Sequence, residues 1–289
     1  MKFVTYTYNG VTAPGVLTAD ESAVIPASEL GYAAKSMNEL IDQLGGTMPV
    51  IPAEATSIAL SAVKLEAPIP EPKQDVVCLG LNYRDHVEEA TRADAVFDVQ
   101  RGDAVYFAKR LQKAVAPGDM IDGHFDICDS LDYEVELGVI IGKDAKNVKT
   151  EDALEYIFGY TIINDVSARN LQTRHKQWYF GKSLDDFTPM GPCIVTPESI
   201  GAKPELDIRC YINGEKRQDS NTRMMIFDIP YIIEELSAGM TLKAGTVIAT
   251  GTPSGVALGM PPETQKYLVS GDVIRCEIDG IGVLENTVK

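Results

Sequence analysis

Two glutamates and one aspartate have the types and the spacing to hold a divalent metal ion. Glu134 and Glu136 alternate with apolar residues in S-L-D-Y-E-V-E-L-G-V-I-I-G, residues 130–142, which is the period-two pattern of a half-buried strand. Both side chains therefore point the same way, roughly 6.5–7 Å apart along the strand. Asp165 ends the next apolar run, Y-T-I-I-N-D. Three carboxylates without His or Cys make an all-oxygen set, which suits magnesium or manganese better than zinc.

Each of these acids also has a purely structural interpretation. Two glutamates at alternate positions can form the solvated face of a strand, and Asp165 is well placed as the N-cap of a helix that we expect to follow it. The residue pattern alone leaves both interpretations open.

Four motifs occur in one order between about Cys78 and the C-terminus. They are D-Y-E-x-E-L-x-x-x-I-G, N-D-V-S-A-R-N-x-Q, F-G-K-S-x-D-x-F-x-P-x-G-P and T-G-T-P-x-G-V. Together they resemble the fumarylacetoacetate hydrolase family, in the branch of the acylpyruvases and the 2-hydroxyhepta-2,4-diene-1,7-dioate isomerases. The resemblance implies that Glu134, Glu136 and Asp165 are ligands of Mg²⁺, with Mn²⁺ as the alternative.

A further segment, G-L-N-Y-R-D-H-V-E-E, carries a candidate general base. His86 and Glu89 lie three residues apart, so on a helix they share one face and the carboxylate can orient the imidazole. Such a pair is also common as a surface ion pair. The resemblance implies that His86 and Glu89 activate a water molecule, and that the polar segment 88–103 is a lid over bound substrate.

The resemblance also implies three substrate-binding residues, Arg169, Gln172 and Thr252, and a catalytic lysine, Lys182. Arg169 and Gln172 share a helix face, and an arginine can bind a carboxylate through two parallel hydrogen bonds. Thr252 lies in a glycine-rich turn, T-G-T-P-S-G-V, whose backbone N–H groups can hold an anionic oxygen. Lys182 would stabilise developing negative charge, although a lysine in this aromatic segment could equally extend to water.

The role of Lys109 stays open at this level. It lies in Y-F-A-K-R, where the family usually continues F-x-K-P, and Arg110 replaces that proline. Lys109 could contact substrate, or both cations could simply be solvated.

Composition limits the partners. The 289 residues carry a formal charge of −16, which argues against nucleic acid or an anionic membrane surface but not against a small anionic substrate. No apolar run approaches membrane-spanning length, and the N-terminus has no signal-peptide core. Five scattered cysteines without a C-x-x-C pair fit a reducing compartment. We therefore expect a cytoplasmic protein that binds a small keto acid and, by the resemblance, forms a homodimer.

The elements that must position these residues form two units. Residues 1–70 predict a small α+β domain, with a hairpin at Asn9-Gly10 and a short helix capped by Ser36. The connector A-P-I-P-E-P-K marks the boundary, and residues 71–289 form the catalytic domain. The resemblance implies an α+β protein in which a mixed β-sandwich roll carries the active site.

The reaction follows from the resemblance. It implies a metal-dependent hydrolase that cleaves a C–C bond in a 2,4-diketo (acylpyruvate-type) acid through a metal-bound enolate. His86 favours hydrolysis, because an attacking water needs a base. Decarboxylation of oxaloacetate-like acids and enol–keto isomerisation of muconate-derived 2-hydroxy acids pass through the same intermediate and are the alternatives. A metal-binding protein without catalysis would have no need of His86, Arg169, Lys182 and Thr252 together.

Overall fold

The structure is a computed structural model that describes residues 1–92 and 102–289. Residues 93–101, the greater part of the predicted lid, lie outside the described residues. Within the described ranges, no helix combines the length and the apolar character needed to cross a membrane.

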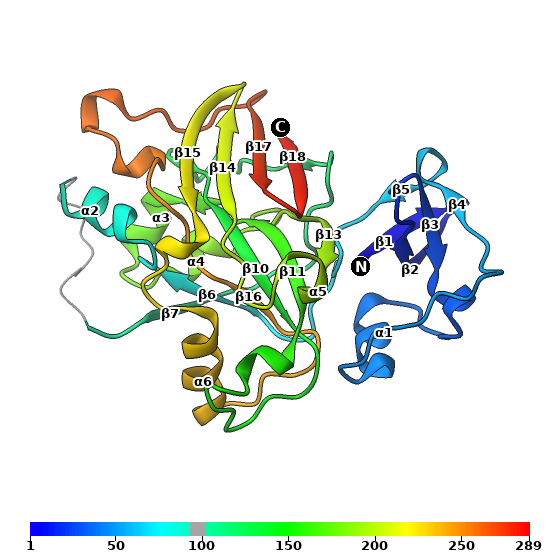
Figure 1. The fold of residues 1–289 in the computed structure, drawn as a ribbon. Helices are drawn as coiled ribbons and strands as arrows, with labels where there is room; N and C mark the ends of the chain where they lie inside the picture. Colours follow the sequence, from blue (N-terminus) through cyan, green and yellow to red (C-terminus); the bar gives the residue numbers. More distant parts are fainter. Residues whose placement is uncertain (93–101) are drawn as a thin grey trace.

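One large mixed sheet runs through the described chain (Figure 1). Its strand order is β4-β3-β2-β1-β13-β11-β10-β16-β6-β7, and β5 pairs with β1 beside that path. The strands are β1 (Lys2–Tyr8), β2 (Val11–Leu17), β3 (Ala23–Pro26), β4 (Ile58–Ala59), β5 (Lys64–Leu65), β6 (Val76–Gly80), β7 (Val105–Lys109), β10 (Val135–Ile141), β11 (Ile157–Asn164), β13 (Met190–Val195) and β16 (Val247–Ala249).

The N-terminal unit contains the predicted hairpin and helix. Strands β1 and β2 pair across the Asn9-Gly10 turn, and α1 (Met37–Leu44) begins after Ser36, whose Oγ accepts a hydrogen bond from the backbone N–H of Glu39 over 3.2 Å. Its strands continue the large sheet, because β1 pairs with β13 through Phe3 and Ile194. The domain boundary near residue 70 stays a prediction.

A second sheet packs over the catalytic part of the first and completes the sandwich (Figure 1). Its order is β15-β14-β17-β18-β8, and a two-stranded sheet joins β9 to β12. The bounds are β8 (Met120–Ile121), β9 (Leu131–Asp132), β12 (Ser167–Ala168), β14 (Asp207–Ile212), β15 (Glu215–Asn221), β17 (Val273–Ile278) and β18 (Gly282–Val288). The protein is therefore a mixed α+β protein built mostly of sheet, as predicted.

Strand β10 differs from the expected half-buried strand, because it is buried on both faces. Leu137 belongs to the core shared with the second sheet, and Ile140 belongs to a separate core on the other face. The predicted strand is also interrupted at Tyr133 and Glu134, which separate β9 from β10. A central strand of a sandwich has no solvated face, so Glu136 is buried within β10, and Glu134, directly before the strand, is buried as well.

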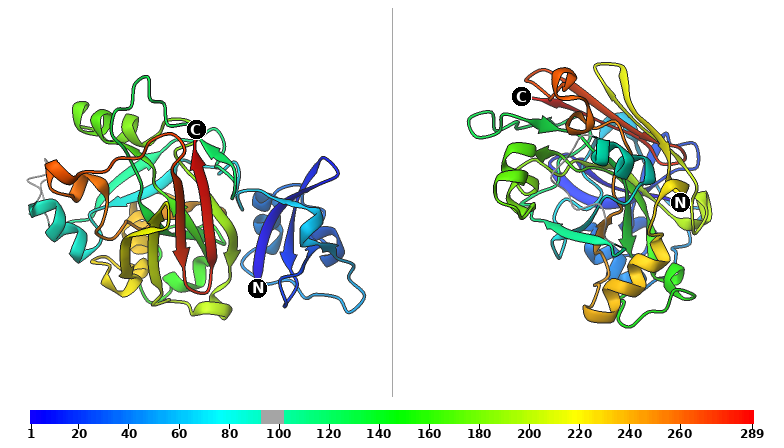
Figure 2. Two further views of the ribbon diagram at one scale, coloured as in Figure 1. Left: turned by 90° about the horizontal axis from the view of Figure 1, so that it is seen from above. Right: turned by 90° about the vertical axis from the view of Figure 1, so that its left-hand side faces the viewer.

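The helices and short helical turns connect the strands. Figure 2 shows α2 beside the segment near residue 260, at the end of the molecule away from the N-terminal unit. The helices are α2 (Arg84–Arg92), α3 (Arg169–Arg174), α4 (Tyr179–Lys182), α5 (Pro197–Ile200) and α6 (Ile229–Gly239), and the 3-10 turns are η1 (Ala27–Leu30), η2 (Leu60–Ala62), η3 (Ala153–Tyr156), η4 (Thr222–Met224), η5 (Ala257–Gly259) and η6 (Pro262–Thr264).

Candidate active site

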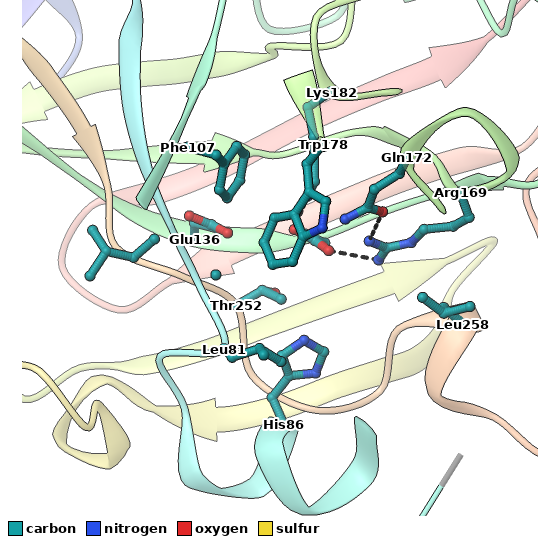
Figure 3. Close-up of a pocket in the computed structure, with 13 residues that line it drawn as sticks. Leu81, His86, Phe107, Glu136, Arg169, Gln172, Trp178, Lys182, Thr252 and Leu258 are labelled. Atoms are coloured by element: carbon teal, nitrogen blue, oxygen red, sulfur yellow. Dashed lines mark hydrogen bonds and ion pairs between the residues drawn. The ribbon is translucent and has the colours of Figure 1, made fainter. Parts of the chain in front are cut away.

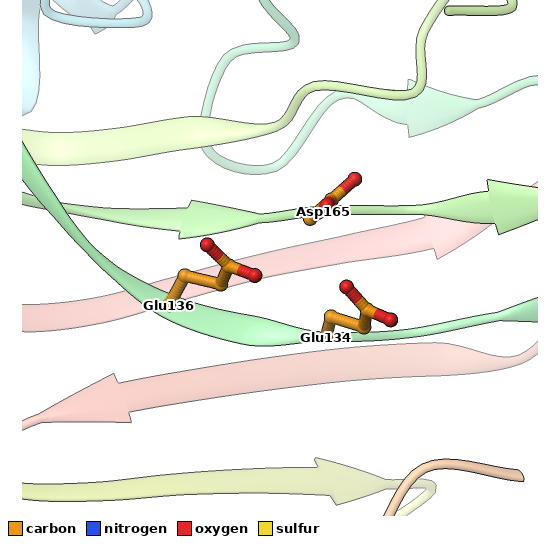
Figure 4. Close-up of side chains that lie close together, drawn as sticks. All are labelled: Glu134, Glu136 and Asp165. Atoms are coloured by element: carbon orange, nitrogen blue, oxygen red, sulfur yellow. The ribbon is translucent and has the colours of Figure 1, made fainter. Parts of the chain in front are cut away.

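The three predicted metal ligands converge at the end of the β10–β11 pair (Figure 4). Glu134 directly precedes β10, Glu136 lies within it, and Asp165 directly follows β11. The backbone N–H of Asp165 donates to the carbonyl oxygen of Glu134 over 2.8 Å, which keeps the two strand ends together. One carboxylate oxygen from each residue lies within 4.8 Å of the others, and all three residues are buried.

Asp165 is not a helix cap. Helix α3 begins after Ala168, and no side chain caps it. Residues 167–168 first form strand β12, which pairs with β9. The capping interpretation of Asp165 is therefore wrong, because the chain returns to extended structure before the helix begins.

Two cations balance the charge of Glu134. Lys182 Nζ lies 2.7 Å from Glu134 Oε2 and 2.8 Å from Asp165 Oδ2, and Arg169 Nη2 lies 2.6 Å from Glu134 Oε1. Burial acts to raise the pKa of Glu134, but the charges of Lys182 and Arg169 outweigh it and lower this pKa to about 2. Lys182 is fully buried between two acids, so it is not a lysine that extends to water.

Glu136 has a different environment. Its Oε2 accepts a hydrogen bond from the backbone N–H of Gly251 over 2.8 Å. Burial, together with the neighbouring charges of Asp165 and Glu134, raises the pKa of Glu136 well above its usual value. The trio therefore concentrates negative charge on one side of the cavity, and a divalent cation would relieve that repulsion.

Lys109 is neither solvated nor placed in the cavity wall. It is fully buried, and its Nζ donates to Asp165 Oδ1 over 2.5 Å and to the carbonyl oxygen of Val166 over 3.0 Å. Burial lowers the pKa of Lys109, against the opposing charge of Asp165. The interpretation of Lys109 as a solvated cation is wrong. Although β7 lies at the edge of the sheet, this side chain is buried against Asp165.

Arg169 is held in place by a buried acid that the sequence did not single out. Arg169 Nε donates to Asp132 Oδ2 over 2.9 Å, and Nη1 donates to Gln172 Oε1 over 3.0 Å. Its Nη2 is buried and makes no aligned hydrogen bond, so its contact with Glu134 is an ion pair. This leaves Nη2 with donor capacity that a ligand carboxylate can use.

The Thr252 hydroxyl lines the cavity but is already hydrogen-bonded. It donates to the carbonyl oxygen of Val135 over 2.9 Å and accepts from Gln218 Nε2 over 2.8 Å. The Gln218 side chain is fully buried, and its Oε1 also accepts from Val135 N–H over 3.0 Å. Gln218 therefore braces the glycine-rich turn against β10, and sequence spacing gave no signal for it, because it comes from the other sheet.

His86 and Glu89 form the predicted pair on α2. His86 Nδ1 lies 3.2 Å from Glu89 Oε2, and the side chains are 13% and 15% exposed. An ionised carboxylate only accepts, so this contact assigns the Nδ1 proton to the imidazole and leaves Nε2 to exchange a proton with a ligand. The pair is largely buried, unlike an ordinary surface ion pair.

Apolar side chains complete the cavity (Figure 3). In this view His86 lies on the opposite side of the cavity from Lys182 and Glu136, and the Trp178 ring lies between them. Trp178 packs edge-on to Phe107, with 5.2 Å between ring centroids, and over Gly80, where any Cβ would overlap the ring. The centre of a water molecule can reach about 30 Å³ of the cavity. The cavity is lined by Leu79, Gly80, Leu81, His86, Phe107, Glu134, Glu136, Arg169, Gln172, Trp178, Lys182, Thr252 and Leu258.

The donor set fits a hard divalent cation. Glu134, Glu136 and Asp165 offer only carboxylate oxygens, which are the ligands that Mg²⁺ and Mn²⁺ prefer. Burial and the neighbouring charges of Asp165 and Glu134 raise the pKa of Glu136, and a bound cation would stabilise its ionised form. The predicted residues that the structure brings to one cavity are His86, Glu134, Glu136, Arg169, Gln172, Lys182 and Thr252, with Glu89 and Asp165 directly behind them.

Comparison with known proteins assigns the family. The model of the fumarylacetoacetate (FAA) hydrolase C-terminal family matches residues 75–289. The chain belongs to this family, whose members include hydrolases, isomerases and tautomerases. The motifs that carried the resemblance in the sequence lie around the cavity just described.

Individual relatives have different named activities. Oxaloacetate tautomerase YisK of Bacillus subtilis (strain 168) is 44% identical over 282 residues, which are 96% of this chain and 87% of that protein. Oxaloacetate tautomerase fahd2, mitochondrial, of Xenopus laevis is 40% identical over 233 residues, 80% of this chain and 70% of that protein. The solved structure of a fumarylacetoacetate hydrolase from psychrophilic Exiguobacterium antarcticum superposes with a TM-score of 0.86 at 40% identity, covering 100% of this chain and 99% of that chain.

Proposed function

We propose that the protein is a metal-dependent enzyme that interconverts the enol and keto forms of a compact 2-oxo dicarboxylic acid such as oxaloacetate. The observation that carries the proposal is the placement of one oriented imidazole, His86, across a small cavity from three buried carboxylates. Two relatives that are 40% or more identical are named oxaloacetate tautomerases, which supports the same chemistry. The sequence favoured hydrolysis first; we place tautomerisation ahead of it because of these two named relatives.

Ketonisation moves one proton. The enol oxygen at C2 loses its proton, C3 gains one, and the C2=C3 double bond becomes a C2=O double bond. His86 would donate the proton to C3 through Nε2 and recover one from the enol oxygen or from water. Glu89 holds the opposite ring nitrogen at 3.2 Å and would stabilise the protonated imidazole.

The remaining residues bind and orient the acid. Arg169 Nη2 is ion-paired with Glu134 but makes no aligned hydrogen bond, so we assign Arg169 the C1 carboxylate, with Gln172 fixing the direction of the guanidinium. Lys182 would stabilise the negative charge that develops on the C2 oxygen. A Mg²⁺ or Mn²⁺ ion held by Glu134, Glu136 and Asp165 would supply Lewis-acid polarisation of that oxygen.

The size of the cavity favours a short substrate. The cavity is narrow, with about 30 Å³ of space that the centre of a water molecule can reach, and a four-carbon acid fits such a site more easily than a longer acylpyruvate. Trp178, Phe107 and Leu258 supply this apolar wall. The same walls exclude water from the proton-transfer step.

C–C hydrolysis of a 2,4-diketo acid is the second candidate. It is favoured by the match to the Exiguobacterium antarcticum hydrolase along the full length of both chains. It needs an attacking water, for which His86 would act as the base. Both reactions thus use the same residues and differ in whether His86 exchanges its proton with carbon or with water.

The test is a product analysis. Enol-oxaloacetate and a series of 2,4-diketo acids are followed by loss of ultraviolet absorbance, with Mg²⁺ and with a chelator, and the products are identified. Metal-dependent loss of the enol signal with oxaloacetate intact supports the tautomerase. Release of pyruvate and a carboxylic acid from the diketo acids supports the hydrolase, and release of carbon dioxide from oxaloacetate overturns both.

A further inference from the structure

The first turn of α2 is attached to two other elements by a single carboxylate, that of Asp85. Its Oδ2 accepts hydrogen bonds from Ser220 Oγ in β15 over 3.2 Å and from Ser254 Oγ in the glycine-rich turn over 3.1 Å. Its Oδ1 accepts from the backbone N–H of His86 over 3.0 Å. Asp85 therefore joins the helix that carries the candidate base to the second sheet and to the turn beside the metal ligands.

Glu89, one turn later on α2, contacts the same glycine-rich turn. Both oxygens of Glu89 accept from the backbone N–H of Gly255, at 3.0 and 3.2 Å, while Oε2 also lies against His86. Gly255 has φ +104°, and a Cβ there would overlap the carbonyl oxygen of Arg217. At Gly259 a Cβ would overlap the Glu89 carboxylate itself. The turn is thus shaped to receive these carboxylates.

The chain just before the helix has its own fixed point. Asn82 donates through Nδ2 to the carbonyl oxygens of Thr250, over 2.7 Å, and Phe227, over 3.1 Å, and its Oδ1 accepts from Phe227 N–H over 2.8 Å. Asn82 is fully buried. Helix α2 therefore begins two residues after a fixed point of the chain, and the contacts of Asp85 and Glu89 set the direction of the helix.

We propose that Asp85 is a positioning residue for the reaction: by docking α2 on Ser220 and Ser254, it holds the His86 imidazole over the cavity. The inference rests on the proposed role of His86 as the proton-transferring group. Asp85 itself does not line the cavity, so it acts through His86 and not on the substrate.

Two kinds of variant separate docking from the local contact of Asp85 with the His86 backbone. Ser220→Ala with Ser254→Ala removes both donors and leaves the contact between Asp85 Oδ1 and His86 N–H intact. Asp85→Ala removes the docking and this local contact together, and Asp85→Asn keeps an acceptor oxygen. Arg84→Ala is the matched control, because Arg84 is an exposed neighbour on the same turn.

The kinetic test is a double-mutant cycle measured in the presence of Mg²⁺. The serine pair variant and Asp85→Ala should each lower kcat by about 10- to 100-fold, since small displacements of a reacting group cost this much. Asp85→Ala should add little in the serine-pair background, because the docking is already lost. Asp85→Asn should recover part of the rate, and Arg84→Ala should match the wild type. Fully additive losses would overturn the proposal.

The position of His86 can also be read without any activity. Diethylpyrocarbonate modifies accessible imidazoles, and mass spectrometry can follow each of the three histidines, His86, His124 and His175, separately. In the serine-pair and Asp85→Ala variants, His86 should be modified several-fold faster than in the wild type, while His124 and His175 keep their rates as internal controls. Unchanged labelling of His86 in both variants would overturn the docking role, whatever the kinetics.

The two readouts also keep this inference distinct from the proposed function. If His86→Ala retained full activity while the docking variants exposed His86 to the reagent, the catalytic assignment of His86 would fall and the docking of α2 would stand. If labelling and kcat change together, both hold.

Discussion

Lys109 donates a hydrogen bond from Nζ to Oδ1 of Asp165 over 2.5 Å, and neither side chain is exposed. The other oxygen of Asp165 lies 2.8 Å from Lys182. Asp165 is therefore held from two sides by buried ammonium groups, so its carboxylate orientation is fixed before any ligand arrives. The acidic trio is an electrostatic unit with its own counter-charges, and not three independent acids.

Lys109→Met should destabilise the protein strongly. Removing one partner of a buried ion pair leaves its charge poorly compensated, which costs about 3–5 kcal/mol in free energy of unfolding, with the lower end expected here because Lys182 remains. Urea denaturation in the presence of a chelator measures the change. Arg110→Met, at the exposed neighbouring position, is the control, and equal small losses in both variants would contradict the importance of the Lys109–Asp165 pair.

Magnesium should stabilise the folded protein, and the trio should be required for this. A ligand that binds only the folded state adds about 2.7 kcal/mol at a concentration 100 times its Kd. Thermal unfolding with Mg²⁺ and with chelator should therefore show a higher Tm with metal, and Glu134→Gln or Asp165→Asn should remove most of that difference. Glu263→Gln, at an exposed position, should keep it. A full Mg²⁺ effect in the trio variants would place the metal elsewhere.

Glu136→Gln should stabilise the metal-free protein near neutral pH. The pKa of Glu136 is raised in the folded state by burial and by the charges of Asp165 and Glu134, so its ionised form opposes folding at pH values above the folded-state pKa. The penalty falls as the pH drops through that pKa and is gone below the unfolded value near 4.5. The Tm gain of the variant over wild type, measured in chelator, should therefore shrink from pH 8 to pH 5. A Tm gain that increases toward acid pH would show that the ionised form of Glu136 does not oppose folding.

Glu134 should behave in the opposite way. Its pKa is lowered to about 2, because the charges of Lys182 and Arg169 outweigh burial, so its contribution to stability is complete above pH 4.5 and is lost between 4.5 and 2. Each pKa unit corresponds to about 1.4 kcal/mol. Acid unfolding of metal-free wild type and Glu134→Gln should show a difference that disappears as the pH falls through this window. A difference that persists at pH 2 would show that the ion pairs do not set this pKa.

His86→Ala should remove catalysis and leave metal binding. A positioned acid–base group contributes about 10²- to 10⁴-fold to a rate, so kcat should fall by that range. The Mg²⁺-dependent rise in Tm should persist, because the carboxylates that would hold the ion belong to Glu134, Glu136 and Asp165. His175→Ala, at an exposed position, should leave both properties at the wild-type level. Retained activity in His86→Ala would eliminate His86 as the proton-transferring group.

The proximity of the three acids is predictable from the sequence for a local reason. Glu134 and Glu136 are two residues apart on one strand, and Asp165 ends the next strand, so pairing of β10 with β11 was enough to bring them together. His86 and Glu89 share a helix face for a similarly local reason. Contacts of this kind depend on strand alternation and helical spacing, which are visible in one sequence.

The residues that the sequence missed are those that act across distant elements. Gln218 reaches Thr252 and β10 from the second sheet, and Asp132 joins Arg169 to the backbone N–H groups of Ala257 and Leu258, at 2.8 and 3.0 Å. Neither has a spacing signal, because the partners lie far apart along the chain. Their roles depend on how the two sheets stack.

The amino-acid sequence by itself determined the strand and turn pattern, the family, and which three acids lie together, since these follow from local periodicity and from motifs. The tertiary structure alone decided the electrostatics. Burial gives Glu134, directly before β10, and Glu136, within it, opposite pKa shifts, and Lys109 lies buried against Asp165. Burial and charge compensation depend on which distant side chains surround a group, and no local pattern specifies that.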